Sequence, residues 1–372
     1  MVARVSAESG RRPIIVDAHE DIAYNALSFG RNYALSAQAT RRAEANSDVP
    51  QHTGRATLGL PEWLAGRVAV VFATLFVMPD PARSGPWELQ SYRDPQEAYR
   101  RGIAQLEYYR RFVDDHPETA LIGTRADLEA VLASWESPGA EQGRVGFVPL
   151  MEGADPIREP KEVEEWYERG VRIVGPAWSA TRYAGGTQIP GPLTPLGREL
   201  LEAMAEVGMI LDVSHLSEEA CAEALDRYEG AVIASHTNPR AVVSELGAPP
   251  RRHFSDEMIA RLVERDGVEG IIPLNNWLKR GYSRGDPKES VTLEHMVAAI
   301  DYVCQIAGDA RHVGLGTDLD GGFGAERIPA ELDTIADLGK LGPALAARGY
   351  TPADVEAVLN GNWLRVLRAR LP

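Results

Sequence analysis

Eight short apolar runs, each followed by a helical or a loop-and-helix pattern, constrain the fold of this chain more than any other feature. They lie at residues 14–16, 67–77, 145–151, 171–177, 209–213, 231–234, 268–274 and 312–316. Strands that alternate with helices form βαβ units and a parallel sheet, and eight of them in a chain of 372 residues indicate a (β/α)8 TIM barrel. The competing fold is an open doubly wound sheet, but no glycine-rich phosphate loop follows the first run. We therefore predict an α/β barrel.

The segments between these runs predict the helices of the barrel. Helical patterns cover residues 96–115, 124–134, 161–169, 195–207, 255–264, 293–307, 336–348 and 352–370, and a further helix begins after Ser217. Residues 24–57 are polar and poorly periodic, so we expect a long excursion with one short helix there. Because no long linker interrupts the pattern, we expect a polar tail at residues 1–13 and a single barrel domain at residues 14–372.

Composition argues against several classes of partner. The hydrophobic fraction of 44% and the charged fraction of 25% are those of a soluble globular protein. The net charge of −15 argues against nucleic acid and anionic membrane surfaces, because both bind clustered Lys and Arg. Residues 1–13 lack the apolar core of a secretory signal, and no run approaches the ~20 residues of a membrane span. We expect a cytoplasmic protein without a membrane partner, and a homodimer stays open.

Polar side chains suited to metal binding follow most of the apolar runs. In barrels of this type the chemistry takes place at the C-terminal ends of the strands. The residues at those ends are His19, Asp21, Glu152, Trp178, His215, His236, Asn275 and Asp318. His19 and Asp21 are two residues apart, so they share one face if the first strand continues that far. Three histidines and three carboxylates on one rim predict a site for a divalent metal such as zinc.

One carboxylate of this set can join two metal ions. Glu152 is placed to bridge an ion held by His19 and Asp21 and a second ion held by His215 and His236. Paired ions hold a shared hydroxide and polarise a carbonyl at the same time. The set therefore predicts a binuclear hydrolase centre.

The carboxylate left over, Asp318, is the candidate proton shuttle between a water molecule and a leaving amine. Asp320, two residues on, is expected to be a loop group that supports the site, although it could stand in for Asp318. Solvated or structural roles are expected for His52, His116, His295 and His312.

Several segments carry a family pattern. These are Asp17–Asp21, Glu152–Gly153, Asp212–His215, Ser235–His236, Gly316–Gly321 and Asn360–Val366. Together they resemble the membrane dipeptidase (renal dipeptidase) family, peptidase family M19, over a region from about Ile14 to Leu367. The resemblance implies a binuclear zinc hydrolase of the amidohydrolase-like barrel group.

The resemblance also implies a role for each matching residue. His19 and Asp21 would bind one zinc ion, His215 and His236 the other, and Glu152 would bridge the two. Asp318 matches the acid/base of the family. Arg252 matches the arginine that holds the C-terminal carboxylate of the substrate, with the adjacent Arg251 as the alternative if the register is shifted by one.

One position departs from the family pattern. Where the dipeptidases of the family carry a histidine on the fourth strand, within a Thr-His sequence, this chain has Ala177-Trp178. That histidine binds substrate and stabilises the tetrahedral intermediate, whereas an indole donates one hydrogen bond and cannot become cationic. The alternative is that Trp178 packs the pocket floor. We expect poor cleavage of ordinary L,L-dipeptides, with metal-dependent hydrolysis retained, and Trp178, Arg252 and Asn275 are the candidates for substrate binding.

Three functional hypotheses follow. The leading one is a hydrolase with two Zn²⁺ ions, or another divalent metal, that uses a metal-bridged hydroxide to cleave a dipeptide or dipeptide-like small molecule. The second is a related barrel hydrolase that acts on an N-acyl amino acid or a lactone. The third is a metal-binding relative without turnover. The presence of Asp318 beside a complete ligand set favours an enzyme, because metal storage needs no proton shuttle.

Overall fold

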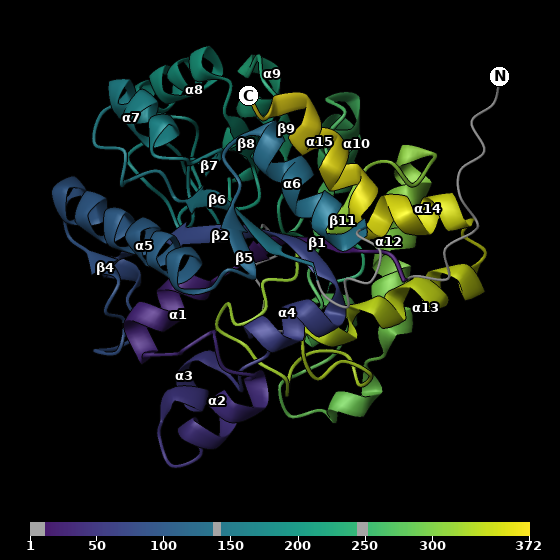
Figure 1. Ribbon diagram of the computed structural model, residues 1–372. Coiled ribbons are helices and arrows are strands. Elements are labelled where there is room, and N and C mark those ends of the chain that lie inside the picture. Colours follow the sequence, from purple (N-terminus) through teal and green to yellow (C-terminus); the bar gives the residue numbers. More distant parts are fainter. Residues whose placement is uncertain (1–11, 137–142, 244–251) are drawn as a thin grey trace.

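A ring of parallel strands surrounded by helices organises the protein (Figure 1). The computed structural model describes residues 12–136, 143–243 and 252–372. Within these residues, the strands of the ring are, in order, β10 (Glu269–Ile271), β11 (Val313–Leu315), β1 (Ile15–Glu20), β2 (Val68–Phe76), β6 (Val145–Glu152), β7 (Ile173–Gly175), β8 (Ile210–Asp212) and β9 (Val232–Ile233). A parallel bridge between Ala234 and Glu269 joins β9 to β10. The predicted (β/α)8 barrel is confirmed.

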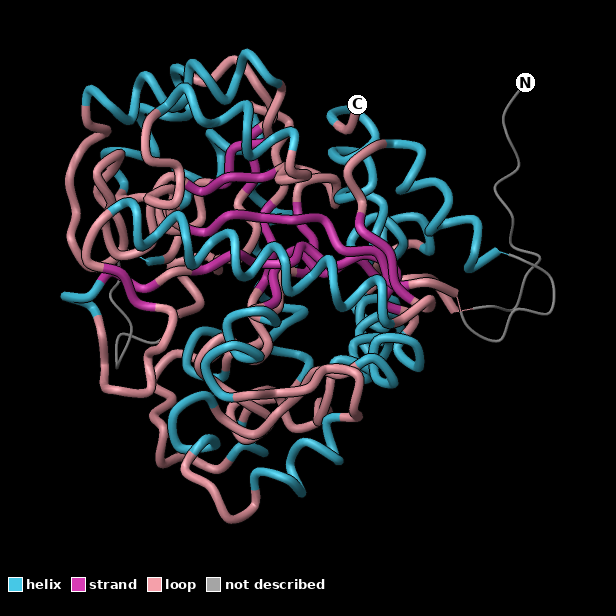
Figure 2. Tube along the Cα trace, turned by 60° about the vertical axis from the view of Figure 1, so that its left-hand side comes forward, coloured by secondary structure: helices cyan, strands magenta, loops and turns pink. Residues whose placement is uncertain are grey.

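The long strands are buried on both faces. Every residue of β2 and of β6 is buried, which explains why these strands read as nearly continuous apolar runs in the sequence. Figure 2 shows the strands running through the middle of the molecule, with helices on both sides of them. The core therefore consists of the barrel interior and the layer between the strands and the helices.

Periodicity located the helices that cover the barrel. Their bounds are α5 (Pro95–Asp115), α6 (Arg125–Glu136), α7 (Val163–Glu168), α8 (Pro195–Val207), α9 (Glu218–Arg227), α10 (Asp256–Glu264), α12 (Leu293–Ala307), α13 (Leu341–Arg348), α14 (Pro352–Glu356) and α15 (Asn362–Arg370). Ser217 caps α9 by accepting a hydrogen bond from the backbone N–H of Ala220, as its position before the helix predicted. The last predicted helix is divided, because the π-helical turn η6 (Ala357–Gly361) lies between α14 and α15.

The prediction of a single short helix between residues 24 and 57 is wrong. The excursion contains α1 (Ile22–Phe29), α2 (Ala37–Glu44) and α3 (Val49–Thr53), and α4 (Leu60–Gly66) follows it. These helices are short, and α2 buries Glu44, whose carboxylate forms an ion pair with Arg31 at 2.8 Å. A buried ion pair replaces the apolar stripe that periodicity detects, which is why the sequence pattern missed this helix.

Several minor elements also escaped the sequence analysis. They are the paired strands β3 (Met78–Pro79) and β4 (Ser91–Tyr92), the strand β5 (Thr119–Leu121) beside β6, the short helix α11 (Asn275–Leu278), and the 3-10 turns η1 (Asp80–Ala82) and η4 (Lys288–Ser290). The helical patterns predicted over residues 161–169 and 336–348 begin with the 3-10 turns η2 (Pro160–Glu162) and η5 (Ile335–Lys340). Runs of two to four residues are too short to show a period. Among the helices that the structure describes, none combines the length and the apolar character needed to cross a bilayer.

A buried acid lies where the ring closes. Glu269 is fully buried in β10, and among the described residues neither of its carboxyl oxygens has a hydrogen-bond partner. Burial raises the pKa of this carboxyl group to about 8. At neutral pH the folded protein therefore holds a proton on Glu269 that the unfolded chain releases. Between the unfolded and the folded pKa, the native state binds more protons, so the free energy of unfolding falls as pH rises.

We expect Glu269→Gln to remove this loss of stability, because the amide keeps the shape of the protonated acid and cannot ionise. The unfolding free energy of the variant minus that of wild type should increase by on the order of a few kcal/mol as the pH rises from about 5 to about 8. Urea denaturation at both pH values measures the gain. The exposed Glu202 on α8 supplies a matched control, Glu202→Gln. Equal pH dependence in wild type and Glu269→Gln would contradict the prediction.

Candidate metal centre

The predicted ligands meet at the C-terminal rim of the barrel. His19 lies in β1, and Asp21 begins α1 as its N-cap residue, directly after the strand. Glu152 is the last residue of β6, and His215 and His236 follow β8 and β9. Parallel strands in a closed ring place all these ends on one side, which brings together residues that are far apart in the sequence. The strand does not extend to Asp21, yet the carboxylate of Asp21 still lies beside His19.

Glu152 lies between two groups of ligands. One carboxylate oxygen, Oε2, lies 3.7 Å from Nε2 of His19, which in turn lies 4.0 Å from Oδ1 of Asp21. The other oxygen, Oε1, lies 2.9 Å from Nε2 of His215 and 3.4 Å from Nε2 of His236. In each group the ligand-type atoms are within 4.8 Å of one another. This is the arrangement that the sequence predicted for a bridging carboxylate.

The polar atoms of this cluster do not satisfy one another. Nε2 of His19 and Oδ1 of Asp21 are buried, and neither has a hydrogen-bond partner among the described residues. Nε2 of His215 faces Nε2 of His236 at 2.9 Å. Buried polar groups are normally paired, and unpaired ones need an explanation. Imidazole nitrogens and carboxylate oxygens converging in this way fit divalent metal ions, which would satisfy all of these atoms.

Supporting hydrogen bonds turn the imidazole Nε2 atoms toward the cluster. Asp212 accepts the hydroxyl proton of Ser235 at 2.5 Å, so the Ser235 oxygen accepts a hydrogen bond from Nδ1–H of His236 at 2.8 Å. In the same way the hydroxyl of Thr187 lies 2.9 Å from Nδ1 of His215. With protons on Nδ1, both histidines present an Nε2 lone pair to a metal.

Burial and charge set the protonation of the cluster. Burial lowers the pKa of His215 to about 4, and it lowers the pKa of His236 well below its usual value, so both are neutral and able to bind a metal. Burial opposes the charged form of His19 too, but the carboxylates of Glu152 and Asp21 outweigh this and raise its pKa to about 9. Burial, followed by the charge of Glu152, raises the pKa of Asp21 to about 7. A divalent cation would replace the protons that balance these acids.

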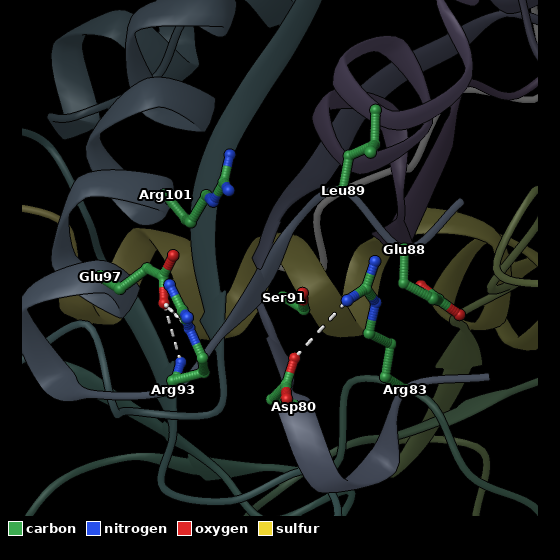
Figure 3. A pocket seen from close by; sticks show the side chains of 8 residues that line it. All are labelled: Asp80, Arg83, Glu88, Leu89, Ser91, Arg93, Glu97 and Arg101. Atoms are coloured by element: carbon green, nitrogen blue, oxygen red, sulfur yellow. Dashed lines mark hydrogen bonds and ion pairs between the residues drawn. The ribbon is translucent and has the colours of Figure 1, made fainter. Parts of the chain in front are cut away.

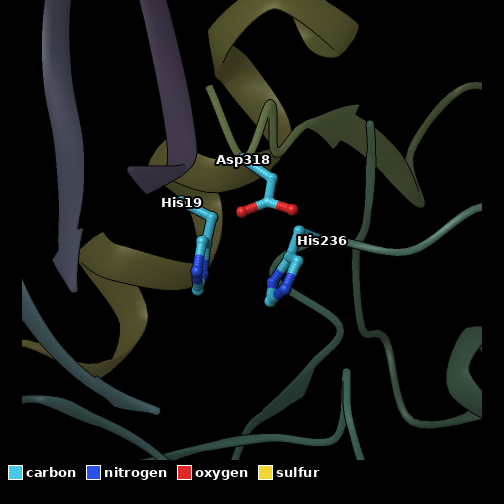
Figure 4. A group of neighbouring side chains, drawn as sticks. All are labelled: His19, His236 and Asp318. Atoms are coloured by element: carbon cyan, nitrogen blue, oxygen red, sulfur yellow. The ribbon is translucent and has the colours of Figure 1, made fainter. Parts of the chain in front are cut away.

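Asp318 faces two of the ligands. Figure 4 shows its carboxylate beside the rings of His19 and His236, whose centroids are 3.6 Å apart. The backbone of Asp318 has φ of 54°, which Asp tolerates better than most residues, and its N–H donates to the carbonyl of His19. Any Cβ at position 321 would collide with the Asp318 carboxylate, so Gly321 is needed next to it. Burial raises the pKa of Asp318 well above its usual value.

Asp320 points away from the cluster, as expected for a supporting loop group. Its carboxylate accepts hydrogen bonds from Thr57 at 2.7 Å and from Tyr33 at 3.1 Å, and it forms an ion pair with Arg31 at 3.0 Å. Its carbonyl accepts a hydrogen bond from the side chain of Asn25 at 2.9 Å. These contacts anchor the loop that carries Asp318 to the excursion after β1.

A cavity of about 300 Å³ opens over the cluster. Its lining includes Asp21, Glu152, His215, His236 and Asp318, together with the predicted substrate-binding residues Arg252 and Trp178. Arg252 is buried, and its guanidinium donates to the carbonyls of Ser214 and His236 at 2.9 and 2.8 Å. Asn275 does not line this cavity; it is fully buried, and its amide lies 3.5 Å from the Tyr282 hydroxyl. Arg251 lies outside the described residues.

The sequence analysis overlooked several residues around the site. Tyr24, Phe29 and Trp87 line the cavity. His52 lines it as well, although a solvated or structural role was expected for it. His253, which the sequence analysis left unassigned, is buried beside Arg252, with its ring 4.9 Å from that of Trp277. The aromatic residues in the segments that follow β1 and β2 were the sequence feature that could have located this part of the cavity.

Comparisons with known proteins agree with this picture. The model of the membrane dipeptidase family (peptidase family M19) matches residues 7–370. An uncharacterized protein in the pqqA 5′ region of Klebsiella pneumoniae is 32% identical over 234 residues, which are 60% of this chain and 82% of that protein. Dipeptidase tcpJ of Claviceps purpurea is 34% identical over 179 residues, which are 47% of this chain and only 38% of that protein.

A solved structure shares the fold. It is a metallo peptidase from Rhodobacter sphaeroides liganded with a phosphinate mimic of the dipeptide L-Ala-D-Ala. The alignment covers 97% of this chain and 100% of that chain, with a TM-score of 0.76 and 22% identity. At that identity the likeness supports the fold alone.

We expect Ser235→Ala to weaken zinc binding about 10–100-fold, because His236 loses the partner that orients its ring. Competition with a chelating dye measures the affinity, and circular dichroism checks the fold. Ser290→Ala is the matched control, because the Ser290 hydroxyl is outside the cavity and has no partner among the described residues. Unchanged zinc affinity in Ser235→Ala would show that the hydrogen bond to His236 does not orient the ligand.

Proposed function

Because the chain belongs to the membrane dipeptidase family and is a hydrolase of the metallodipeptidase type, we propose that it binds two zinc ions and cleaves the amide bond of a dipeptide or a dipeptide-like small molecule. The observation that carries the proposal is the position of Glu152. One of its oxygens faces His19 and Asp21, and the other faces His215 and His236. This is what a carboxylate shared by two ions requires.

The bound ions would supply an activated water at neutral pH and polarise the substrate carbonyl. The side chains of the rim handle the protons. Asp318 lines the cavity beside the cluster, within reach of a water or a substrate atom. We assign to it the transfer of a proton from the attacking water to the nitrogen of the leaving amine, a role suited to a carboxyl group whose pKa burial has raised.

Arg252 is assigned to the carboxylate of the substrate. Its two terminal nitrogens are held by backbone carbonyls, while its buried Nε atom has no hydrogen-bond partner among the described residues. No ion pair of Arg252 is found in the part of the chain that the structure describes. The charges of Asp318 and Glu152 act on it without a direct ion pair, so a carboxylate bound in the cavity would supply the contact partner that this buried guanidinium lacks among the described residues.

The substrate class rests on relatives. The Claviceps purpurea relative is named a dipeptidase, and the Rhodobacter sphaeroides structure holds a mimic of L-Ala-D-Ala. Trp178 favours a second candidate, hydrolysis of an N-acyl amino acid. Its indole lines the cavity 6.1 Å from the ring of His215, where it cannot act as a cationic donor toward a dipeptide.

We expect Asp318→Asn to lower turnover of dipeptides by at least ~100-fold, because the amide cannot carry the proton. Zinc content should stay at about two ions per chain in both proteins, since Asp318 is not one of the assigned ligands. Elemental analysis and steady-state kinetics measure the two quantities. Asp114→Asn, an exposed change near the end of α5, is the control. Retained turnover would remove Asp318 as the shuttle, and a zinc content of one or below would remove the bridged pair.

A separate prediction concerns Trp178→His. An imidazole at this position regains a donor for the developing oxyanion, worth at most about 10²–10³ in rate. The smaller ring also loosens the pocket, because Trp178 packs 5.0 Å from the ring of Phe76, and poorer positioning cancels part of the gain. We expect kcat/KM on simple L,L-dipeptides to rise about tenfold at equal zinc occupancy. If wild type already cleaves them as fast as the variant, Trp178 is a wall of the pocket.

We also propose that residues 14–372 form a single domain and that the protein is cytoplasmic, and a homodimer remains one of the open oligomeric states. Limited proteolysis, cell fractionation and analytical ultracentrifugation would test them in turn.

A further inference from the structure

The cavity over the metal cluster has a second, largely apolar half. We call it the aromatic subsite, and it is formed by Tyr24, Phe29, His52, Phe76, Met78, Trp87 and Trp178. These residues come from α1, from the end of α3, from the end of β2 and the segment after it, and from the loop after β7. None of them belongs to the metal ligands or to the proton path proposed above.

The rings of the subsite form a continuous series that starts at a metal ligand. The ring of Trp178 lies 6.1 Å from that of His215 and 5.0 Å from that of Phe76. Tyr24 follows, with its ring 5.3 Å from Phe76 and 6.4 Å from Phe29.

The series ends in a stacked group. His52 stacks on Phe29 at 6.4 Å and on Trp87 at 3.9 Å. All of these side chains line the same space of about 300 Å³. A pocket of this size with an apolar lining and a few polar groups is typical of a site for a small organic ligand.

The part of the aromatic subsite at the end of β2 lies across the barrel rim from Arg252. In the ring order β10-β11-β1-β2-β6-β7-β8-β9, three strands separate β2 from β9 in either direction. Phe76 and Met78 mark the end of β2. Arg252 donates to the carbonyl of His236, which follows β9. A substrate whose carboxylate is held at Arg252, with its amide at the metal cluster, therefore extends its acyl side toward the aromatic subsite.

We propose that the aromatic subsite binds an aromatic side chain on the acyl side of the scissile amide, so that the preferred substrates are dipeptides with an aromatic N-terminal residue. This inference rests on the proposed function, because it takes Arg252 as the carboxylate anchor. Aromatic pairs attract beyond simple burial when their rings meet at offset or edge-on angles, and this subsite offers rings at several angles.

One polar residue in the wall of the subsite offers an alternative partner for the N-terminal side chain of the substrate. Glu88 is buried, lines the same cavity and accepts a hydrogen bond from the Tyr24 hydroxyl. A carboxylate next to aromatic rings would also suit a cationic side chain. Lysyl dipeptides therefore belong in the test, as the alternative that would overturn the proposal.

The first experiment compares kcat/KM of the zinc-loaded enzyme on Phe-Ala, Leu-Ala, Lys-Ala, Ala-Ala and Ala-Phe, each with an L- and a D-configured second residue. Phe-Ala should exceed Ala-Ala by about 30-fold, the factor expected from burying a phenyl group, and Ala-Phe should not share the gain. A preference for Lys-Ala, or equal rates across the panel, would overturn the proposal.

Substitution of Trp87 tests the subsite itself. We expect Trp87→Ala to lower kcat/KM on Phe-Ala at least ~10-fold more than on Ala-Ala. The variant loses the contacts of the Trp87 ring with the phenyl group of Phe-Ala, and Ala-Ala has no such group. The control is Leu89→Ala. Leu89 is 47% exposed and lines a separate cavity formed with Asp80, Arg83 and Arg93 (Figure 3), so this change should leave the ratio of the two rates unchanged. Circular dichroism and zinc content confirm that both variants are folded.

A binding measurement separates the subsite from the reaction. Calorimetry with zinc-loaded Asp318→Asn protein compares the dissociation constants of Phe-Ala and Ala-Ala, and binding of Phe-Ala that is about 30-fold tighter supports the subsite. Equal affinities overturn it. If wild type cleaves dipeptides without aromatic preference, only this inference fails. If it cleaves no dipeptide while Phe-Ala binds more tightly, the proposed function fails and the subsite stands.

Discussion

Closure of the parallel sheet into a ring is the constraint on which the rest of the structure depends. Because the strands run in one direction and β9 is joined to β10 through the bridge from Ala234 to Glu269, every C-terminal strand end lies on one rim. His19 from β1 and His236 from the segment after β9 are therefore brought to a ring separation of 3.6 Å. In an open sheet, with this order of strands, the two segments would lie toward different parts of the sheet and could not share a metal.

The buried acids at the rim fall into two groups. Some accept hydrogen bonds that hold the loops of the rim in place, and others have oxygens left free to bind a ligand. Asp17 accepts the backbone N–H of Thr317 at 2.7 Å, and Asp212 accepts the backbone N–H of Ser235 at 2.9 Å. Both acids thus pin the loops that carry neighbouring functional residues. Asp21, in contrast, has a buried oxygen without a partner among the described residues. Such a buried carboxyl group is costly unless a proton or a cation completes it: the isolated Glu269 holds a proton, whereas Asp21 lies among converging histidine and carboxylate ligand atoms that fit a metal ion.

The candidate metal centre and the aromatic subsite come from different parts of the chain. The candidate metal ligands sit on strands or directly after them, where the barrel holds them rigidly. The aromatic subsite comes mostly from the excursions after β1 and β2, which are the parts of a barrel that vary most easily. The ion pair between Arg31 and Asp320 connects the two parts, because it ties the excursion to the loop that presents Asp318. A change in the excursion can thus alter both the aromatic subsite and the position of Asp318.

The sequence by itself determined the barrel and the main helices, and it picked out the candidate metal ligands. Alternating apolar runs and helical periods are local signals, and His19, Glu152, His215 and His236 stand at recognisable strand ends. The sequence also grouped them around Glu152, but only the tertiary structure decided how close their side chains lie, since those distances depend on strand order around the ring. It also decided that Asn275 lies outside the cavity, and that scattered aromatic residues of α1, α3 and the segment after β2 form one wall of the site. Those contacts join segments without a common period, so no local pattern could reveal them.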